Sequence, residues 1–298
     1  MKSRLLALLV LVAALAVAAG CGSDDDGGAS SAPAGTGSSA AADPCAKENL
    51  QLVNSGKLTI ATSNPSFPPW FIGPGGAPWD PTSKPTHKGF EAGVAYAVAS
   101  ALGFSDAEVQ WVAVGFDQSY APGPKNFDFT LQQIEFTPKR AQAVDFSDSY
   151  LDLNQALVAP KTSDIANATT IADLKDAKLG APVGTTSYDY IINTIQPSQD
   201  PAVYNTQNDA VAALKANQID GIVVDLPTAF YITSAQAPGS KIVGQFPPAG
   251  EPGHLGLVLE KGSSLTPCLN QALTKLRDDG TLASLEQKWL QADAPVLK

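Results

Sequence analysis

The sequence is most informative at FDFTLQQIEFTPKRAQAVDFSDSY, residues 127–150. Residues 127–136 are rich in residues with high β-propensity, and we expect strand structure there. Arg140 follows at the expected start of a helix, where a positive charge is mildly unfavourable. A guanidinium can offer two parallel hydrogen bonds to a carboxylate, and the mildly unfavourable position of Arg140 slightly favours a functional role for it. The alternative is a surface arginine that binds nothing.

Short apolar runs alternate with helical patterns on both sides of this stretch. The predicted strands are residues 58–62, 109–114, 156–159, 178–182, 221–224 and 254–259. The predicted helices are residues 91–102, 170–176, 187–195, 208–216 and a pair within 265–289. Gly103 ends the first helix, and Asp279 and Gly280 separate the last two. Repeated βα units predict an α/β fold with mostly parallel sheets.

Residues 72–88 interrupt this alternation with Gly, Pro and polar residues around Trp79. A structureless segment of this length in a compact domain usually has a purpose of its own. It is either a flap over a binding pocket or a plain insertion, and the sequence leaves both interpretations open.

The N-terminus has the layout of a secretory signal. Lys2 and Arg4 precede an uncharged apolar run, residues 5–19, which is short for a membrane span. We therefore expect residues 1–20 to be a signal peptide. Such a segment directs the chain out of the cytoplasm.

Cys21 directly follows small residues, which resembles the lipobox of acylated proteins, although Ala18 stands where Leu, Val or Ile is usual. We expect Cys21 to carry lipid; the alternative is an ordinary signal peptide with a cysteine nearby. Residues 21–44 are rich in Gly, Ser, Ala and Asp and predict a flexible linker behind that anchor.

Composition narrows the classes of partner and chemistry. The net charge of the chain is −10 at pH 7, which argues against nucleic acid and against a polybasic membrane contact. Membrane contact is therefore expected through the N-terminal lipid only. His87 and His254 are the two histidines, and no metal, nucleophile or phosphate-binding motif is present. We expect no catalytic residue, no metal and no cofactor.

Cys45 and Cys268 remain as a pair at the two ends of the folded region. In an exported protein an even pair predicts a disulfide. It would close a long loop, for which the entropy argument gives about 4–5 kcal/mol. The alternative is two separate buried thiols.

The stretch at residues 127–150 resembles the polar amino acid binding proteins of ATP-driven importers, the type 3 extracellular solute-binding family. The resemblance rests on FDF at 127–129, TPKR at 137–140, VDFS at 144–147 and Tyr150. Further segments agree in order and spacing: NPSFPPW at 64–70, GFE at 89–91, GTTS at 184–187, DGIVVD at 220–225 and LRDDGT at 276–281 with Trp289. Gly93 departs from the family pattern, which usually has Asp there.

The resemblance implies a periplasmic-binding-protein-like fold of type II, with two α/β lobes, two hinge strands and a ligand cleft between the lobes. Lobe one would be residues 46–154 plus 255–298, and lobe two residues 155–254. The implied function is the extracytoplasmic binding subunit of an amino acid ABC importer. A monomer would capture a polar or basic amino acid by hinge closure and deliver it to a permease with its ATPase.

The resemblance also assigns the groups that recognise an amino acid. Arg140 would hold the α-carboxylate, helped by backbone N–H groups of Thr185 and Thr186 at a helix start. Asp225 would receive the α-ammonium. For Thr185, Thr186 and Asp225 the alternative is plain capping of a helix.

The remaining candidates shape the pocket wall. The resemblance places Phe67, Trp70 and Phe116 against the ligand, with plain core packing as the alternative. Gln133 and Glu135 stand where the family commonly has small residues or hydroxyls. Glu135 would hold the α-ammonium or a cationic side chain of the ligand.

Asn64 argues against a basic ligand, because some binders of basic residues have an acidic residue there. Two other functions remain open. The same scaffold hosts dehydratases of small carboxylic acids, for which Glu135 is the candidate general acid or base. A ligand-sensing ectodomain that signals through a partner is the other alternative.

Overall fold

The computed structural model describes residues 43–248, 253–290 and 294–298. The expected signal peptide, Cys21 and nearly all of the linker lie outside these residues. Residues Ala42–Lys298 form one compact unit. Within the described part, no helix is both long enough and apolar enough to cross a membrane.

A first five-stranded sheet has the order β2-β1-β3-β10-β4. Its strands are β1 Leu58–Thr62, β2 Val109–Ala113, β3 Phe129–Thr130, β4 Val144–Leu153 and β10 Gly253–Glu260. Strand β1 pairs in parallel with β2 and β3, whereas β10 pairs antiparallel with β3 and β4. The α/β fold is therefore confirmed in this lobe, with a mixed sheet.

A second five-stranded sheet has the order β7-β6-β8-β5-β9. Its strands are β5 Gln155–Pro160, β6 Leu179–Pro182, β7 Ala202–Tyr204, β8 Gly221–Asp225 and β9 Ser240–Gln245. Strand β6 pairs in parallel with β7 and β8, whereas β5 pairs antiparallel with β8 and β9. The two sheets give the two lobes of the expected fold class.

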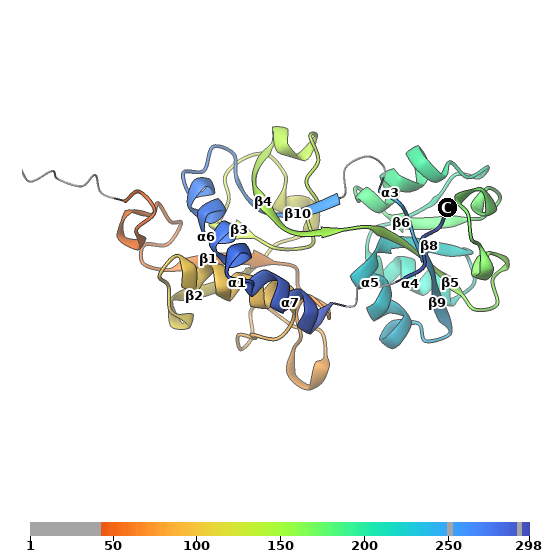
Figure 1. Ribbon diagram of the computed structural model, residues 1–298, viewed down its shortest axis with the longest axis horizontal. Helices are drawn as coiled ribbons and strands as arrows, with labels where there is room; N and C mark the ends of the chain where they lie inside the picture. The colour runs from red at the N-terminus through yellow and green to blue at the C-terminus, as the bar shows by residue number, and fades with distance from the viewer. Residues whose placement is uncertain (1–42, 249–252, 291–293) are drawn as a thin grey trace, which may run out of the picture. The chain divides into compact units, whose positions relative to one another are not determined.

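The expectation of mostly parallel sheets is wrong, because β10 in the first sheet and β5 in the second run against the other strands. Figure 1 shows β4 leading directly into β5, with Asn154 between them. The chain returns from β9 to β10. Strands β5 and β10, by which the chain enters the other sheet, therefore run opposite to the strands of the βα units and pair in the antiparallel sense.

Helices cover the sheets at the places where the sequence predicts them, with few exceptions. They are α1 Phe90–Ala101, α2 Phe116–Ser119, α3 Thr186–Tyr190, α4 Gln207–Lys215, α5 Leu226–Tyr231, α6 Thr266–Asp278 and α7 Thr281–Trp289. The predicted helix at residues 170–176 is only a 3-10 turn, Ile171–Leu174. No sequence pattern predicted β4, β7, β9 or α2, whereas α5 was anticipated only as the helix that Asp225 would cap.

Helix α1 shows why glycine stands at two positions. Gly89 precedes it with φ of 109°, and a Cβ there would lie 2.3 Å from the Trp70 carbonyl oxygen. At Gly93 a Cβ would lie 2.5 Å from a methyl group of Leu285 on α7. The absence of the family's Asp at position 93 therefore lets α1 and α7 pack closely.

The loop at residues 72–88 completes the core of the first lobe. Trp79 is fully buried; it stacks on Phe71 at 5.3 Å between ring centroids and meets the edge of Trp111 at 5.0 Å. None of residues 72–88 lines the cavity described below. The plain-insertion interpretation therefore fits this loop, and the pocket-flap interpretation does not.

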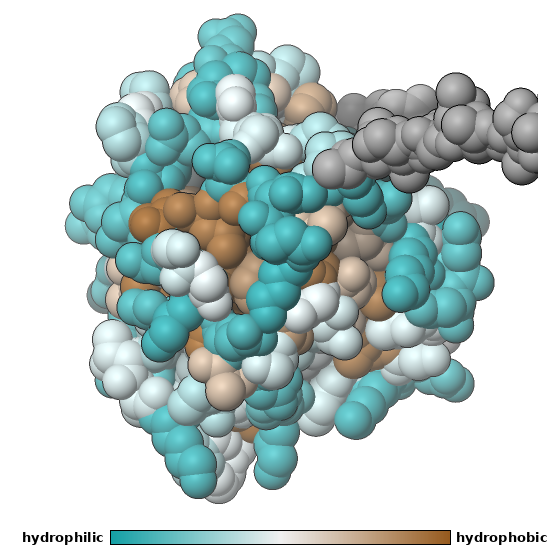
Figure 2. Space-filling model, turned by 90° about the vertical axis from the view of Figure 1, so that its left-hand side faces the viewer, coloured by the Kyte–Doolittle hydropathy of each residue, from teal (hydrophilic) through white to brown (hydrophobic). Residues whose placement is uncertain are grey.

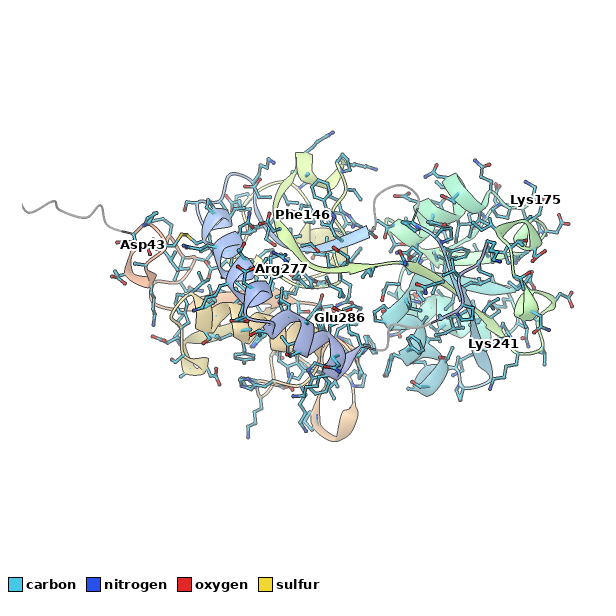
Figure 3. The ribbon with its side chains drawn as sticks, viewed as in Figure 1. Asp43, Phe146, Lys175, Lys241, Arg277 and Glu286 are labelled. Atoms are coloured by element: carbon cyan, nitrogen blue, oxygen red, sulfur yellow. A yellow bond between two sulfur atoms is a disulfide. The ribbon has the colours of Figure 1, made fainter. Side chains whose placement is uncertain are left out.

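The predicted disulfide is confirmed. Cys45 and Cys268 are bonded, with their Cα atoms 5.2 Å apart. Figure 3 draws this bond near the labelled Asp43, where the described chain begins. It ties that beginning to α6. The face of the molecule drawn in Figure 2 is largely hydrophilic, with apolar residues gathered in patches between polar side chains.

The last residues pack against the second lobe rather than the first. Leu297 is 2% exposed and belongs to the second lobe's core. The Gln245 N–H donates to the Pro295 carbonyl at 2.7 Å, and the Lys298 N–H donates to the Thr169 carbonyl at 3.0 Å. Figure 1 marks the C-terminus beside this sheet. The expectation that lobe one runs to residue 298 is therefore wrong for residues 294–298.

We predict that Leu297→Ala lowers the free energy of unfolding of the 42–298 fragment by about 2–5 kcal/mol, because a buried side chain is lost. Val296→Ala is the matched control: Val296 is 55% exposed, so its loss should change little. Urea denaturation measures both. Equal stability of the two variants would show that the C-terminal segment does not pack on the second lobe.

Candidate functional site

A cavity of about 840 Å³ is lined by residues of both sheets and their helices. All ten residues that the sequence nominated for ligand binding lie on its wall: Asn64, Phe67, Trp70, Phe116, Gln133, Glu135, Arg140, Thr185, Thr186 and Asp225. The fold thus brings together segments that are far apart in the chain. The cavity is where a ligand would meet both lobes.

The wall is built first from the segment after β3, which the sequence predicted as strand. Only Phe129–Thr130 is strand, and residues 131–135 turn along the cavity. The turn centres on Gln133, whose φ is 53°. A left-handed residue cannot continue a strand. The predicted strand at residues 127–136 is therefore wrong outside Phe129–Thr130.

Arg140 is buried, with 7% of its surface exposed, so the surface-arginine alternative is wrong. Its guanidinium carbon lies 4.6 Å from the Tyr120 ring centroid and 5.5 Å from that of Phe116. The guanidinium donates to the carbonyls of Glu135 at 2.7 Å and Gly184 at 2.8 Å. Two of its five N–H groups are thus used, which leaves donors for a carboxylate.

Asp225 and Thr185 both cap helices. The Thr228 N–H donates to Asp225 Oδ1 at 2.9 Å at the start of α5, and the Tyr188 N–H donates to Thr185 Oγ1 at 3.2 Å at the start of α3. Capping is therefore confirmed for these two residues. It uses one oxygen of Asp225. Burial raises the pKa of Asp225, and the hydrogen bonds from Thr228 offset part of that rise.

Glu135 is half-buried and faces both lobes. Burial raises the pKa of its carboxyl, while a hydrogen bond with Thr186 and the charge of Arg140 lower it again. The side chain lies against β10, because a Cβ on Gly253 would be 2.1 Å from Glu135 Oε1. Glycine at position 253 therefore leaves the room that this carboxylate occupies.

The aromatic candidates divide between wall and core. The Phe67 ring is half-buried and lies 6.5 Å from the Tyr231 ring, between centroids. Trp70 is 2% exposed, and its Nε1–H donates to Thr228 Oγ1 at 3.0 Å. Trp70 is thus core and cavity wall at once. Asn64 is exposed, and its Nδ2 donates to Asp80 Oδ1 at 3.0 Å.

Sequence reasoning missed Gln132, which is 4% exposed and lines the cavity. Its Nε2 donates to Thr130 Oγ1 at 3.2 Å, and that hydroxyl donates onward to the Ala61 carbonyl at 2.8 Å. This chain fixes the orientation of the amide. Gln132 Oε1 is left without a partner among the described residues. The only signal in the sequence was its place beside Gln133 in the family-like segment.

The charged residues on the wall are unequal in number. Arg140 is the one cation, while Asp117, Glu135 and Asp225 are carboxylates, among the described lining residues. Asp117 accepts a hydrogen bond from the Tyr120 hydroxyl at 2.6 Å. The site therefore presents an anion-binding group and a surplus of negative charge. A ligand with one carboxylate and more than one positive charge would complement it.

Comparison with known proteins shows which family and which individual proteins this chain is similar to. The family described as bacterial extracellular solute-binding proteins, family 3, matches residues 58–292. The L-cystine-binding protein TcyJ of Escherichia coli is 29% identical over 171 residues, 57% of this chain and 62% of that protein. The chain thus spans about three fifths of that relative's length. An L-arginine-binding protein of Pseudomonas aeruginosa is 30% identical over 228 residues, 73% of this chain and 86% of that one.

Among solved structures, an ancestral arginine-binding protein bound to arginine is similar, with a TM-score of 0.64 and 29% identity. The match covers 79% of this chain and 99% of that one. These relatives are named as binding proteins rather than enzymes.

Proposed function

Because the chain belongs to the bacterial extracellular solute-binding proteins, family 3, we propose that it captures a basic amino acid and delivers it to an ABC permease with its ATPase. The observation that carries this proposal is one buried guanidinium among three carboxylates on one cavity wall. The arginine-binding names of two similar proteins support the ligand class.

In this proposal the α-carboxylate of the ligand binds Arg140. The Phe116 and Tyr120 rings hold the guanidinium in place, which reduces the entropy lost on binding. The first turn of α3, at Thr185 and Thr186, adds backbone N–H groups that have no partner within the helix. A carboxylate satisfies both sets of donors.

The α-ammonium of the ligand binds the second lobe and the turn after β3. Asp225 has an oxygen beyond the one that caps α5, and Gln132 Oε1 receives no hydrogen bond from the residues that the structure describes. An ammonium carries three donors, enough for both. Burying these acceptors without a donor costs about 1–3 kcal/mol each, so a ligand that supplies the donor is favoured.

A cationic side chain of the ligand is the natural partner of Glu135, with Asp117 further along the wall. Once Arg140 and Asp225 are paired with the amino acid head group, these two carboxylates leave a negative cavity. A neutral polar side chain would leave that charge uncompensated. This balance favours a basic ligand over a neutral one and outweighs the opposite indication from Asn64.

Capture would proceed by hinge closure. The Arg140–Gly184 and Trp70–Thr228 hydrogen bonds each join an element of the first lobe to one of the second. A ligand that bridges Arg140 and Asp225 would stabilise the arrangement in which such contacts form. The importer would read that closed form of a monomeric, lipid-anchored binding protein at the outer face of the membrane.

We predict that a panel of the twenty amino acids raises the melting temperature of the 42–298 fragment by a few degrees only for basic members, at about 100 times their Kd. Arg140→Ala should weaken binding about thirtyfold or more, because the α-carboxylate of the ligand would then be buried without its cationic partner. Lys139→Ala, at an exposed neighbouring position, is the control. No shift with any amino acid, on ligand-free folded protein, would contradict the proposal.

We predict that Glu135→Gln weakens L-arginine and L-lysine binding about ten- to hundredfold and leaves L-glutamine binding unchanged or stronger, because a charge pair is lost. Isothermal titration measures each Kd. Glu286→Gln on α7, labelled in Figure 3 and away from the cavity, is the matched control. Equal loss for L-arginine and L-glutamine would mean that Glu135 binds the α-ammonium instead.

We predict that Cys21→Ser releases the full-length protein from the membrane fraction of the expressing cell and abolishes its labelling by radioactive fatty acid. Loss of the acyl chain removes the hydrophobic anchoring energy. Fractionation and autoradiography measure the two effects. Unchanged membrane association of the Cys21→Ser chain would rule out the proposed lipid anchor.

A further inference from the structure

A fully buried carboxylate lies directly behind the cavity wall. Glu91 is the second residue of α1, and none of its surface is exposed. Its Oε1 accepts the Gln133 backbone N–H at 2.8 Å and the Tyr150 hydroxyl at 2.5 Å, and its Oε2 accepts from Gln133 Nε2. Among the described residues, no salt bridge involves Glu91. The family-like segment at 89–91 therefore supplies a group that the proposed ligand contacts leave unexplained.

The partner of Glu91 is the residue with the unusual backbone. Gln133 has a φ of 53°, which costs a residue other than glycine about 1–2 kcal/mol. Glu91 holds both its backbone N–H and its side-chain amide. The two neighbours that face the ligand, Gln132 and Glu135, lie on either side of this residue. Their direction depends on the Gln133 turn.

We propose that Glu91 is a positioning residue of the binding site, whose carboxylate holds the Gln133 turn in its left-handed conformation and does so fully only when ionised. This inference rests on the proposed function, since it concerns the affinity of the same cavity. Glu91 does not line the cavity itself and acts through Gln133.

The dependence on ionisation follows from counting donors. Three N–H or O–H groups point at the carboxylate, and an ionised carboxylate only accepts. Protonation turns one oxygen into a donor that faces another donor, so one of the three bonds weakens unless Tyr150 reorients. Loss of a bond to Gln133 releases a backbone conformation that is unfavourable on its own.

The environment places this ionisation near neutral pH. Burial raises the pKa of Glu91 to about 7, although the bonds from Tyr150 and Gln133 lower it, and the charge of Asp225 adds to the rise. The titratable groups that face it are Tyr150 from β4 and Asp225 from β8. Burial also raises the pKa of Tyr150 well above its usual value, so Tyr150 stays neutral. The faces of α6 and α7 that pack on α1 are apolar.

These observations determine the direction in which pH changes the affinity for ligand. As the pH falls from 8 to 6, Glu91 takes up a proton, the turn loosens and the affinity for ligand decreases. One proton limits the change to tenfold per pH unit, and we expect about a three- to tenfold weaker Kd at pH 6 than at pH 8. The stability of the ligand-free protein changes in the opposite direction. The raised pKa stabilises the fold at low pH, and that contribution is lost as the pH rises through about 7.

The test uses the 42–298 fragment, L-arginine as the probe and isothermal titration at pH 6, 7 and 8. The wild type should show the pH-dependent Kd, and Glu91→Gln should bind more weakly with a flat profile. Glu286→Gln, at an exposed position of α7, should keep the wild-type profile. Identical profiles for wild type and Glu91→Gln would overturn the inference.

A double-mutant cycle separates positioning from general damage. Glycine adopts positive φ without the steric cost, so in a Gln133→Gly background Glu91→Gln should cost several-fold less affinity than in the wild type. Equal cost in both backgrounds would show that Glu91 does not act through the Gln133 conformation.

A ligand-free measurement keeps this inference distinct from the proposed function. In nitrogen-15 NMR spectra the Gln133 backbone amide of the wild type should titrate with a midpoint near pH 7. Absence of that titration would overturn the role of Glu91, whether or not Glu91→Gln folds. Failure of the wild type to bind L-arginine, with the titration present, would refute the basic ligand and leave the Glu91 contact supported.

Discussion

A buried cation must find partners, and Arg140 has only some of them within the protein. Two carbonyls and two aromatic rings hold the guanidinium, but no salt bridge to a carboxylate is formed among the described residues. An unpaired buried charge is costly, so such a group persists where a ligand completes it. The Gly184 carbonyl that it reaches belongs to the other lobe. The Arg140 side chain would therefore bind the ligand and also contact the second lobe.

The hydrogen-bond acceptors on the same cavity wall are also held in place by the fold. Asp225 caps α5, Gln132 is locked by Thr130, and Glu135 occupies the space beside Gly253. Each side chain is thus oriented by the fold before any ligand arrives, which reduces the cost of binding. The turn at Gln133 connects these groups to Glu91 and, through Tyr150, to the strand that leads into the second lobe. Cavity and hinge are therefore physically continuous.

Much of this site could be predicted from sequence, because its residues sit in segments whose spacing is characteristic. Arg140, Asp225 and the threonines of the GTTS segment were recognised because their segments resemble those of the family in order and spacing, although they belong to two different sheets. The disulfide followed from an even number of remaining cysteines in an exported chain. The end of helix α1 was predicted from Gly103, which follows it.

Other features depend on tertiary structure that no local pattern encodes. Residues 127–136 have the composition of a strand, but the bonds to Glu91 turn the chain at Gln133, forty-two positions away along the sequence. Gln132 looks like any strand residue until the Thr130 hydroxyl fixes its amide. Leu297 looks like part of a frayed terminus, yet it fills a gap in the second core. The antiparallel pairs arise from the path of the chain between sheets.

The central claim is that an amino acid lies between Arg140 and Asp225 with its charged side chain toward Glu135. A crystal structure of the 42–298 fragment grown with L-arginine tests it most directly. The account predicts the α-carboxylate within hydrogen-bond distance of Arg140, the α-ammonium on Asp225 and Gln132 Oε1, and the ligand guanidinium beside Glu135. A ligand bound elsewhere, or one with its side chain directed away from Glu135, would contradict it.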